Sequence, residues 1–303
     1  MKIAYALRRV VLYPNQGGGL NLPPKEIRGK FLGKAKELGF EGVELGTDVF
    51  DGVSEQASRD LRKELGDAGV PCVILRGGGG LAHPRISVGN RKRLEEAVRI
   101  ASWVGAGIVN TTVGAPPRDP RGRGRTVGEP TSQGSSREAS EEDFERTAKG
   151  LSEVAGMAAD LGVEISIEVH QHSIVDNSWS ALHLLELIDR PNVGVNPDLG
   201  NIYWTYDIPE ESCEAAIVAL APYAKYWHCK NLYRVYIPEK ERAIFVQAPL
   251  PDGEIDYRFA ISAMLDAGYR GYLAIEGVRL GDQFHRDGRS VAYVKALLEE
   301  LGG

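Results

Sequence analysis

The segment EISIEVHQHSIVDNSWSALHLLELIDRPNVGVNPDL, residues 164–199, decides the fold. Its two short apolar runs, EISIEVH and VGVNPDL, have the length and composition of buried strands, and the stretch between them carries apolar residues at helical spacing. A strand, a helix and a second strand in this order predict two parallel strands joined by a right-handed crossover. The segment therefore indicates an α/β fold with a parallel sheet.

The same alternation extends along the rest of the chain. The runs KIAYALR, GVEL, PCVILRG and GIVNTTVG precede this segment, AKYWHCK and GYLAIEG follow it, and helix-like stretches follow each run. Eight strand–helix pairs predict one (β/α)₈ TIM-barrel domain over residues 1–303, a fold of typically about 250 residues. An open, doubly wound sheet is the alternative. Two long loops, at about 115–140 and about 232–255, interrupt the alternation.

The composition limits the possible partners and location. Formal net charge is -6 and both signs are interspersed, so we expect no nucleic-acid partner. No stretch approaches the ~20 apolar residues that cross a bilayer, so we expect no membrane span. The three cysteines are far apart and lack CxxC spacing, which is typical of reduced thiols. We therefore expect a cytoplasmic protein.

Four metal-compatible residues stand near the carboxyl ends of predicted strands: Glu168, Asp198, His228 and Glu276. In a barrel these ends meet at one mouth. Three carboxylates in one pocket need a counter-charge, so the four residues are expected to hold one divalent cation. Mixed carboxylate and imidazole ligation favours Mn²⁺, with Zn²⁺, Co²⁺, Fe²⁺, Ni²⁺ or Mg²⁺ as alternatives. Taken singly, each residue has an ordinary explanation as an ion pair, a helix cap or a buried histidine, so the combination carries the prediction.

Further polar residues flank these positions. His170 lies two residues beyond Glu168 on the same side of its strand, which makes it a candidate acid/base catalyst; packing in the rim is the alternative. Lys230, His172 and Asn201 are predicted to contact the substrate. An ordinary solvated lysine is the alternative for Lys230.

The motifs IEVH, VNPDLGN, WHCKN, PLPDGEIDY and GYLAIEG together resemble the xylose isomerase-like TIM barrels, a superfamily of sugar isomerases and epimerases. The resemblance covers nearly the whole chain. It implies that Glu168, Asp198, His228 and Glu276 bind one divalent metal. It also implies that Glu168 and Glu276 exchange protons with the substrate.

Two departures from the family pattern matter. The endonuclease IV branch carries an additional histidine shortly after the aspartate, where this chain has Leu199, Gly200 and Asn201, so DNA repair is not expected. Many sugar epimerases have an aspartate after the His-x-Lys pair. This chain has Asn231 there, so substrate contacts near Lys230 are expected to differ.

The predicted function is a metal-dependent sugar isomerase or epimerase that abstracts a proton next to a carbonyl and proceeds through an enediolate. The alternative is a lyase similar to the catalytic subunit of C-glycoside deglycosidases, which cleaves 3-keto-C-glycosides by elimination with a histidine base. A minor alternative is a barrel that binds a sugar without turnover. The expected partners are a small-molecule sugar or glycoside and either further copies of the chain or a small partner subunit.

Overall fold

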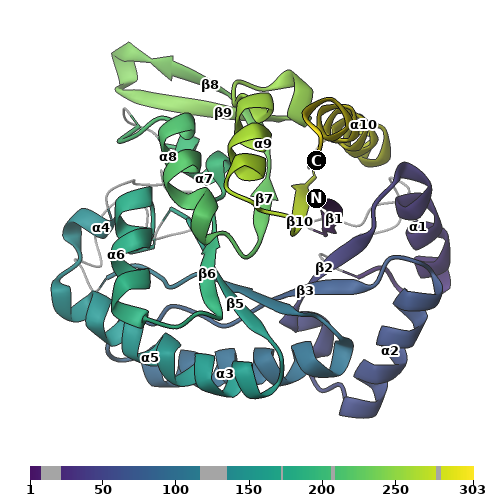
Figure 1. Ribbon diagram of the computed structural model, residues 1–303, viewed down its shortest axis with the longest axis horizontal. Coiled ribbons are helices and arrows are strands. Elements are labelled where there is room, and N and C mark those ends of the chain that lie inside the picture. The colour runs from purple at the N-terminus through teal and green to yellow at the C-terminus, as the bar shows by residue number, and fades with distance from the viewer. Residues whose placement is uncertain (8–21, 117–134, 172, 206–208, 278–280) are drawn as a thin grey trace.

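A ring of parallel strands wrapped by helices forms the body of the molecule (Figure 1). The computed structural model describes residues 1–7, 22–116, 135–171, 173–205, 209–277 and 281–303. The sheet order is β6-β5-β4-β3-β2-β1-β10-β7, with every paired neighbour parallel. The strands are β1 Lys2–Ala6, β2 Gly42–Gly46, β3 Cys72–Arg76, β4 Ile108–Thr111, β5 Glu164–Glu168, β6 Val193–Asn196, β7 Trp227–Cys229 and β10 Tyr272–Glu276. The predicted (β/α)₈ barrel is confirmed, and all eight predicted strands are present.

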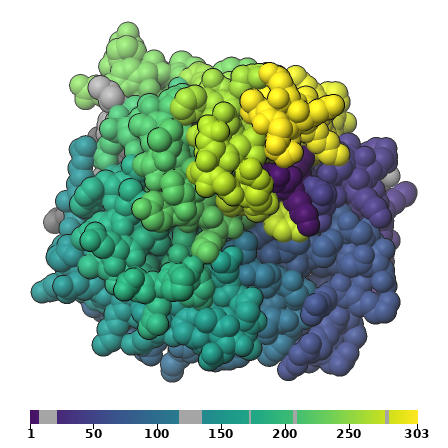
Figure 2. Space-filling view, in the orientation of Figure 1, coloured from purple at the N-terminus to yellow at the C-terminus, as the bar shows by residue number. Residues whose placement is uncertain are grey.

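The ring closes between β6 and β7 through sparse contacts. In the described residues, one bridge pairs Val195 with Ala224, and the backbone N–H of Lys225 donates to the carbonyl of Val195 at 3.0 Å. Nearer the mouth, the side-chain oxygen of Asn196 accepts from the backbone N–H of His228 at 2.7 Å. A side chain thus takes the place of backbone pairing at this end of the seam. Strand β10 is the other neighbour of β7 and pairs with β1, and the purple N-terminal end of the chain reaches the surface beside yellow-green atoms in Figure 2.

Helices cover the outside of the strands (Figure 1). Several begin at the polar caps expected of their sequences; Ser140, for example, forms a reciprocal capping box with Asp143 at the start of α5. The last helix begins at Gln283, where the side chain of Asp282 accepts from the backbone N–H of His285 and caps the helix. The helices are α1 Lys25–Leu38, α2 Glu55–Asp67, α3 Ser87–Val104, α4 Ser135–Glu138, α5 Glu141–Asp160, α6 Ser178–Ile188, α7 Leu199–Tyr203, α8 Cys213–Leu220, α9 Tyr257–Asp266 and α10 Gln283–Leu301, with short 3₁₀ turns at Thr47–Phe50, Ala221–Tyr223, Pro238–Lys240 and Leu250–Asp252.

The two faces of the strands differ in character. Outward-facing residues such as Ile3 and Tyr5 pack with the helices in the main hydrophobic core. A small cluster, separate from that core, fills the inside of the barrel with Ala4, Ala6, Ile74, Tyr226 and Ala274. Because several members are alanines, the inside retains room for polar side chains nearer the mouth.

The second predicted loop, at about 232–255, contains a β-hairpin, so that prediction was wrong for much of its length. Strands β8 (Asn231–Ile237) and β9 (Arg242–Ala248) pair antiparallel and extend along the upper edge of the view in Figure 1. The prolines near this region lie in the short turns beside the strands, where a missing N–H costs no ladder bond. One face of the hairpin exposes four apolar side chains, namely Tyr233, Val235, Ile244 and Val246.

Residues 117–134 of the first predicted loop lie outside the described residues, and 135–138 form α4. Within the described ranges, no helix combines the length and apolar character needed to cross a membrane. Cys72, Cys213 and Cys229 are buried free thiols. The cytoplasmic location and the oligomeric assembly stay predictions.

Candidate metal centre

Four neighbouring strands place the four predicted ligands along one arc of the barrel mouth. Glu168 and Glu276 are the last residues of β5 and β10, His228 is in β7, and Asp198 follows β6 and caps α7. Strands β5 and β6 are paired, β7 and β10 are paired, and the seam joins β6 to β7. The two glutamates therefore stand at the ends of the arc, with Asp198 and His228 between them.

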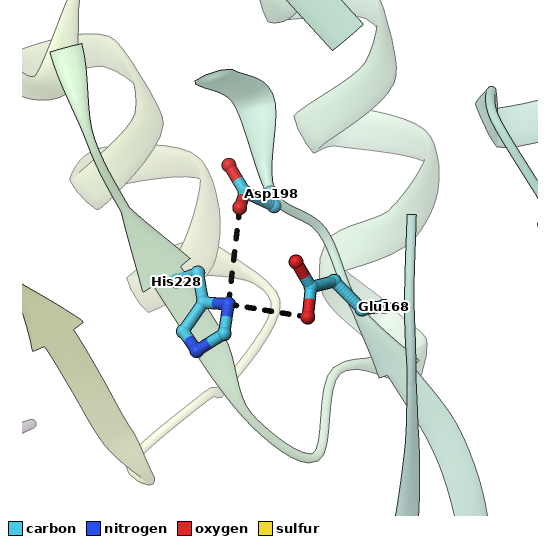
Figure 3. A group of neighbouring side chains, drawn as sticks. All are labelled: Glu168, Asp198 and His228. Carbon is cyan, nitrogen blue, oxygen red and sulfur yellow. Dashed lines mark ion pairs between the residues drawn. The ribbon is translucent and has the colours of Figure 1, made fainter. Parts of the chain in front are cut away.

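Glu168, Asp198 and His228 form a buried cluster. One donor atom from each lies within 4.8 Å of the others. The Nδ1 atom of His228 is 3.5 Å from a Glu168 oxygen and 3.8 Å from an Asp198 oxygen, and both carboxylates face the same ring nitrogen (Figure 3). This convergence brings together three of the four residues whose juxtaposition was predicted from the strand ends.

Two asparagines hold the carboxylates of the cluster in place. The Asn110 amide on β4 donates to Glu168 at 2.9 Å. The Asn201 amide donates to Glu168 at 3.1 Å and to Asp198 at 3.0 Å, and the Asn201 backbone N–H also donates to Asp198 at 3.2 Å. Asp198 is thus both a helix cap and a member of the cluster. Neutral amides therefore orient both carboxyl groups without adding a compensating charge to the cluster.

Lys230 binds the fourth predicted ligand. Its ammonium lies 2.6 Å from a Glu276 oxygen and 2.8 Å from an Asp198 oxygen. Glu276 is consequently outside the three-residue cluster, although the Lys230 ammonium bridges it to Asp198. Burial alone would lower the pKa of Lys230, but Asp198, Glu276 and Glu168 raise it above its ordinary value, so Lys230 carries a positive charge into the pocket.

The charge balance of the cluster reflects crowded acids. Burial raises the pKa of Asp198, and Glu276 and Glu168 raise it further, against the opposing charge of Lys230. Burial lowers the pKa of His228, but the carboxylates of Glu44 and Glu168 outweigh burial and raise it to about 10. The carboxylates of this pocket raise the pKa values of both His228 and Lys230, which shows that the pocket favours positive charge. Such a pocket is suited to a cation.

Glu44 is a buried residue of this site that the sequence did not single out. Its carboxylate on β2 lies 2.6 Å from the Nε2 atom of His228 and accepts from the Tyr226 hydroxyl at 2.7 Å and from Arg76 at 2.6 Å. The available signal was an acidic residue inside the short apolar run GVELG. Asn110 was missed in the same way, as an amide within GIVNTTVG.

The remaining predicted site residues differ in what the structure shows of them. His170 is half-buried, and its Nδ1 atom lies 2.6 Å from the carbonyl oxygen of Gln171. His172 lies outside the described residues. Asn201 orients the acids, and its role in binding substrate stays a prediction.

Asn231, which stands where many sugar epimerases have an aspartate, makes hydrogen bonds to the backbone of neighbouring segments. Its side chain donates to the carbonyls of Leu250 and Ile255 and accepts from the backbone of Leu232 and Ile255, which fastens the segment after the hairpin.

The residues present fit a divalent metal. Two carboxylates and one imidazole converge, and the second ring nitrogen of that imidazole is occupied by Glu44, an arrangement common among metal-binding histidines. Hard oxygen donors with one nitrogen suit Mg²⁺, Mn²⁺ or Zn²⁺. A hollow of about 830 Å³ lies at the other end of β6, beside Val193 and Lys225, and none of the predicted site residues lines it.

Comparison with known proteins gives a consistent picture. The model of the family described as "Xylose isomerase-like TIM barrel" matches residues 32–296. The L-ribulose-5-phosphate 3-epimerase UlaE of Salmonella heidelberg (strain SL476) is 24% identical over 273 residues, which cover 84% of each chain.

Two solved structures share the fold over nearly the full length. A xylose isomerase-like TIM barrel protein from Mycobacterium smegmatis, in complex with magnesium, has a TM-score of 0.77 at 20% identity and is covered over 98% of its chain, with 100% of this one. The 3-keto-D-glucoside 4-epimerase YcjR from E. coli has a TM-score of 0.70 at 16% identity, covering 98% of this chain and 99% of that one.

Proposed function

Because the chain belongs to the xylose isomerase-like TIM barrel family, we propose that it is a divalent-metal-dependent isomerase or epimerase of a keto sugar. The convergence of Glu168, Asp198 and His228 within 4.8 Å carries the proposal. The similarity to a sugar-phosphate 3-epimerase supports the choice of reaction class.

The metal is expected to be held by Glu168, Asp198 and His228, with Glu276 as a fourth ligand once its carboxylate exchanges Lys230 for the ion. When bound, such an ion polarises a substrate carbonyl and stabilises negative charge that develops on its oxygen. Mn²⁺ is the preferred ion, on the grounds of the mixed donor set.

The protein's own contribution is the placement of two carboxylates at the ends of the ligand arc. A keto sugar lying along that arc has Glu168 at one end and Glu276 at the other. One glutamate takes the proton next to the carbonyl, and the other returns a proton to the same carbon or to its neighbour. Return to the same carbon from the opposite face gives epimerisation. Return to the neighbouring carbon, together with transfer of the hydroxyl proton to the former carbonyl oxygen, gives isomerisation. Lys230 contacts Glu276 and Asp198, and in this proposal its ammonium also holds a substrate oxygen.

The proposal is tested by metal analysis together with proton exchange. Purified protein should contain about one divalent ion per chain, and keto sugars incubated with it in D₂O should gain deuterium at the carbon next to the carbonyl. Glu168→Gln should abolish this exchange. Thr205→Val, which changes a buried residue outside the cluster, is the matched control and should retain it. Wild-type protein that binds no divalent metal, or that exchanges no proton with any keto sugar or keto-glycoside, would contradict the proposal.

A lyase acting on 3-keto-glycosides is the second candidate. The likeness to a 3-keto-D-glucoside 4-epimerase and the more accessible position of His170, compared with Glu168, favour it. In this case His170 acts as the base and the aglycone leaves. Aglycone release from oxidised C-glycosides, lost in His170→Ala with metal content unchanged, would select the lyase; full activity of that variant would remove His170 from the mechanism.

A further inference from the structure

A fully buried carboxylate lies beside the metal-binding cluster without belonging to it. Glu44 is 0% exposed, and its register with Ala6 and Ile74 places it on the inner face of the barrel. Removing a carboxylate from water costs several kcal/mol unless good partners compensate it. The partners of the Glu44 carboxylate therefore indicate its role.

The two oxygens of Glu44 have different partners. One accepts from Arg76 Nη1 at 2.6 Å on the neighbouring strand β3. The other accepts from the Tyr226 hydroxyl at 2.7 Å and lies 2.6 Å from Nε2 of His228. The Glu44 carboxylate thus connects β2 and β3 to the histidine that faces the acidic cluster.

We propose that Glu44 is a positioning residue for the metal centre. By accepting the Nε2 proton of His228, it turns Nδ1 toward Glu168 and Asp198, so that this nitrogen coordinates a divalent cation once it has given up its own proton. This inference rests on the proposed function and adds a residue to the site.

The surroundings of the imidazole support a fixed orientation. Its Nδ1 atom is 3.5 Å from Glu168 and 3.8 Å from Asp198, while the opposite nitrogen meets Glu44. The Tyr226 ring packs edge-on against the imidazole, with centroids 4.9 Å apart and an interplanar angle of 69°. Since Tyr226 also donates to Glu44, one carboxylate holds both the ring and its neighbour.

A purely structural role as the counter-ion of Arg76 makes a different prediction. Neutralising Arg76 requires only the oxygen that faces Arg76, and it has no consequence for which nitrogen of His228 binds an ion. A positioning role predicts that metal affinity falls by about 10-fold to 100-fold when the carboxylate is replaced, as for other partners of metal-binding histidines.

The test compares Glu44→Gln with Tyr226→Phe by isothermal titration of the metal-free proteins with Mn²⁺ and Co²⁺. The first variant removes the carboxylate that faces His228, whereas the second removes a different hydrogen bond to the same oxygen. Glu44→Gln should bind about 10-fold to 100-fold more weakly than wild type. Tyr226→Phe keeps both the carboxylate and the ring that packs against His228, so its affinity should fall by clearly less than that of Glu44→Gln.

A measurement on the wild-type protein keeps the inference testable if Glu44→Gln does not fold. In the zinc-loaded protein, ¹⁵N spectra of the His228 ring should show the proton on Nε2 and the metal on Nδ1. Metal on Nε2, or equal affinities for wild type and Glu44→Gln, would overturn the positioning role alone. A wild-type protein that takes up no divalent metal would instead overturn the proposed function, and this inference with it.

Discussion

The Lys230 ammonium and the proposed divalent ion compete for the same acidic pocket. Replacing Lys230 by methionine removes the ammonium and leaves the pocket to the ion. In the metal-free protein, the Lys230 ammonium contacts Asp198 and Glu276 at 2.8 and 2.6 Å and is only 7% exposed. Methionine retains much of the side-chain volume and removes the charge. Asp198 and Glu276 then lose their shared ammonium, and breaking a buried pair of this kind typically costs about 3–5 kcal/mol.

The expected result is a variant that is much less stable in chelator and that recovers with metal. For a domain of this size, ~3 kcal/mol corresponds to a melting temperature lower by roughly 5 °C. A divalent ion at about 100 times its Kd returns ~2.7 kcal/mol, and it should bind more tightly because it no longer displaces Lys230 from Glu276. The stabilisation by metal should therefore be larger for Lys230→Met than for wild type.

Thermal and urea unfolding, with EDTA and across a Mn²⁺ titration, measure both effects. Lys225→Met is the matched control, because Lys225 contacts Glu164 at 2.6 Å with both side chains partly exposed. Such an exposed pair contributes about 1 kcal/mol or less. Equal losses for the two variants in EDTA, or a metal response of Lys230→Met no larger than that of wild type, would refute the reasoning.

Two further predictions concern residues around the site and on the outer helices. Gly200→Ala should lower the free energy of unfolding by about 1–3 kcal/mol, because the added Cβ would lie 2.3 Å from Cγ of Lys230. Urea unfolding measures this loss. Gly33→Ala is the control: a Cβ added there meets no atom within 4 Å, so this variant should be neutral or slightly stabilised. Burial raises the pKa of Asp143, but hydrogen bonds from Arg146 and Ser140 outweigh it and leave the pKa below its ordinary value. The stabilisation from Asp143 is therefore complete above the unfolded pKa of about 3.9 and is lost as the pH falls through the lower folded value. The stability difference between wild type and Asp143→Asn should accordingly shrink between pH ~6 and pH ~3 in urea unfolding, and a constant difference would contradict the assignment.

The sequence was sufficient for the barrel and for the position of the acids, since both follow from local patterns. Short apolar runs followed by helical spacing predict parallel strands, and an acidic or imidazole residue at a strand end predicts convergence at the mouth. The hairpin β8–β9 had a readable signal as well, because NLYRVYI and RAIFVQA flank the turn sequence PEKE. The nearby prolines concealed it, although they lie beside the strands.

Other features depend on distances between segments far apart in the chain. Glu44 and His228 are separated by 184 positions, and their contact requires knowing which face of β2 points inward and how β2 sits relative to β7. The pairing of Glu276 with Lys230 likewise depends on how a long side chain passes over Gly200, where the missing Cβ leaves room for its stem. Spacing along the chain contains neither piece of information.

The sparse seam between β6 and β7 would give a bound ion a mechanical role in addition to the proposed chemical one. Glu168 and Asp198 come from one side of that seam, and His228 and Glu276 come from the other. An ion shared among them would act as a clasp across the part of the ring where, in the described residues, the backbone contributes fewest links. Removal of the ion by a chelator should then increase the rate of amide hydrogen exchange first in Val193–Asn196 and Trp227–Cys229, before exchange becomes faster in the outer helices.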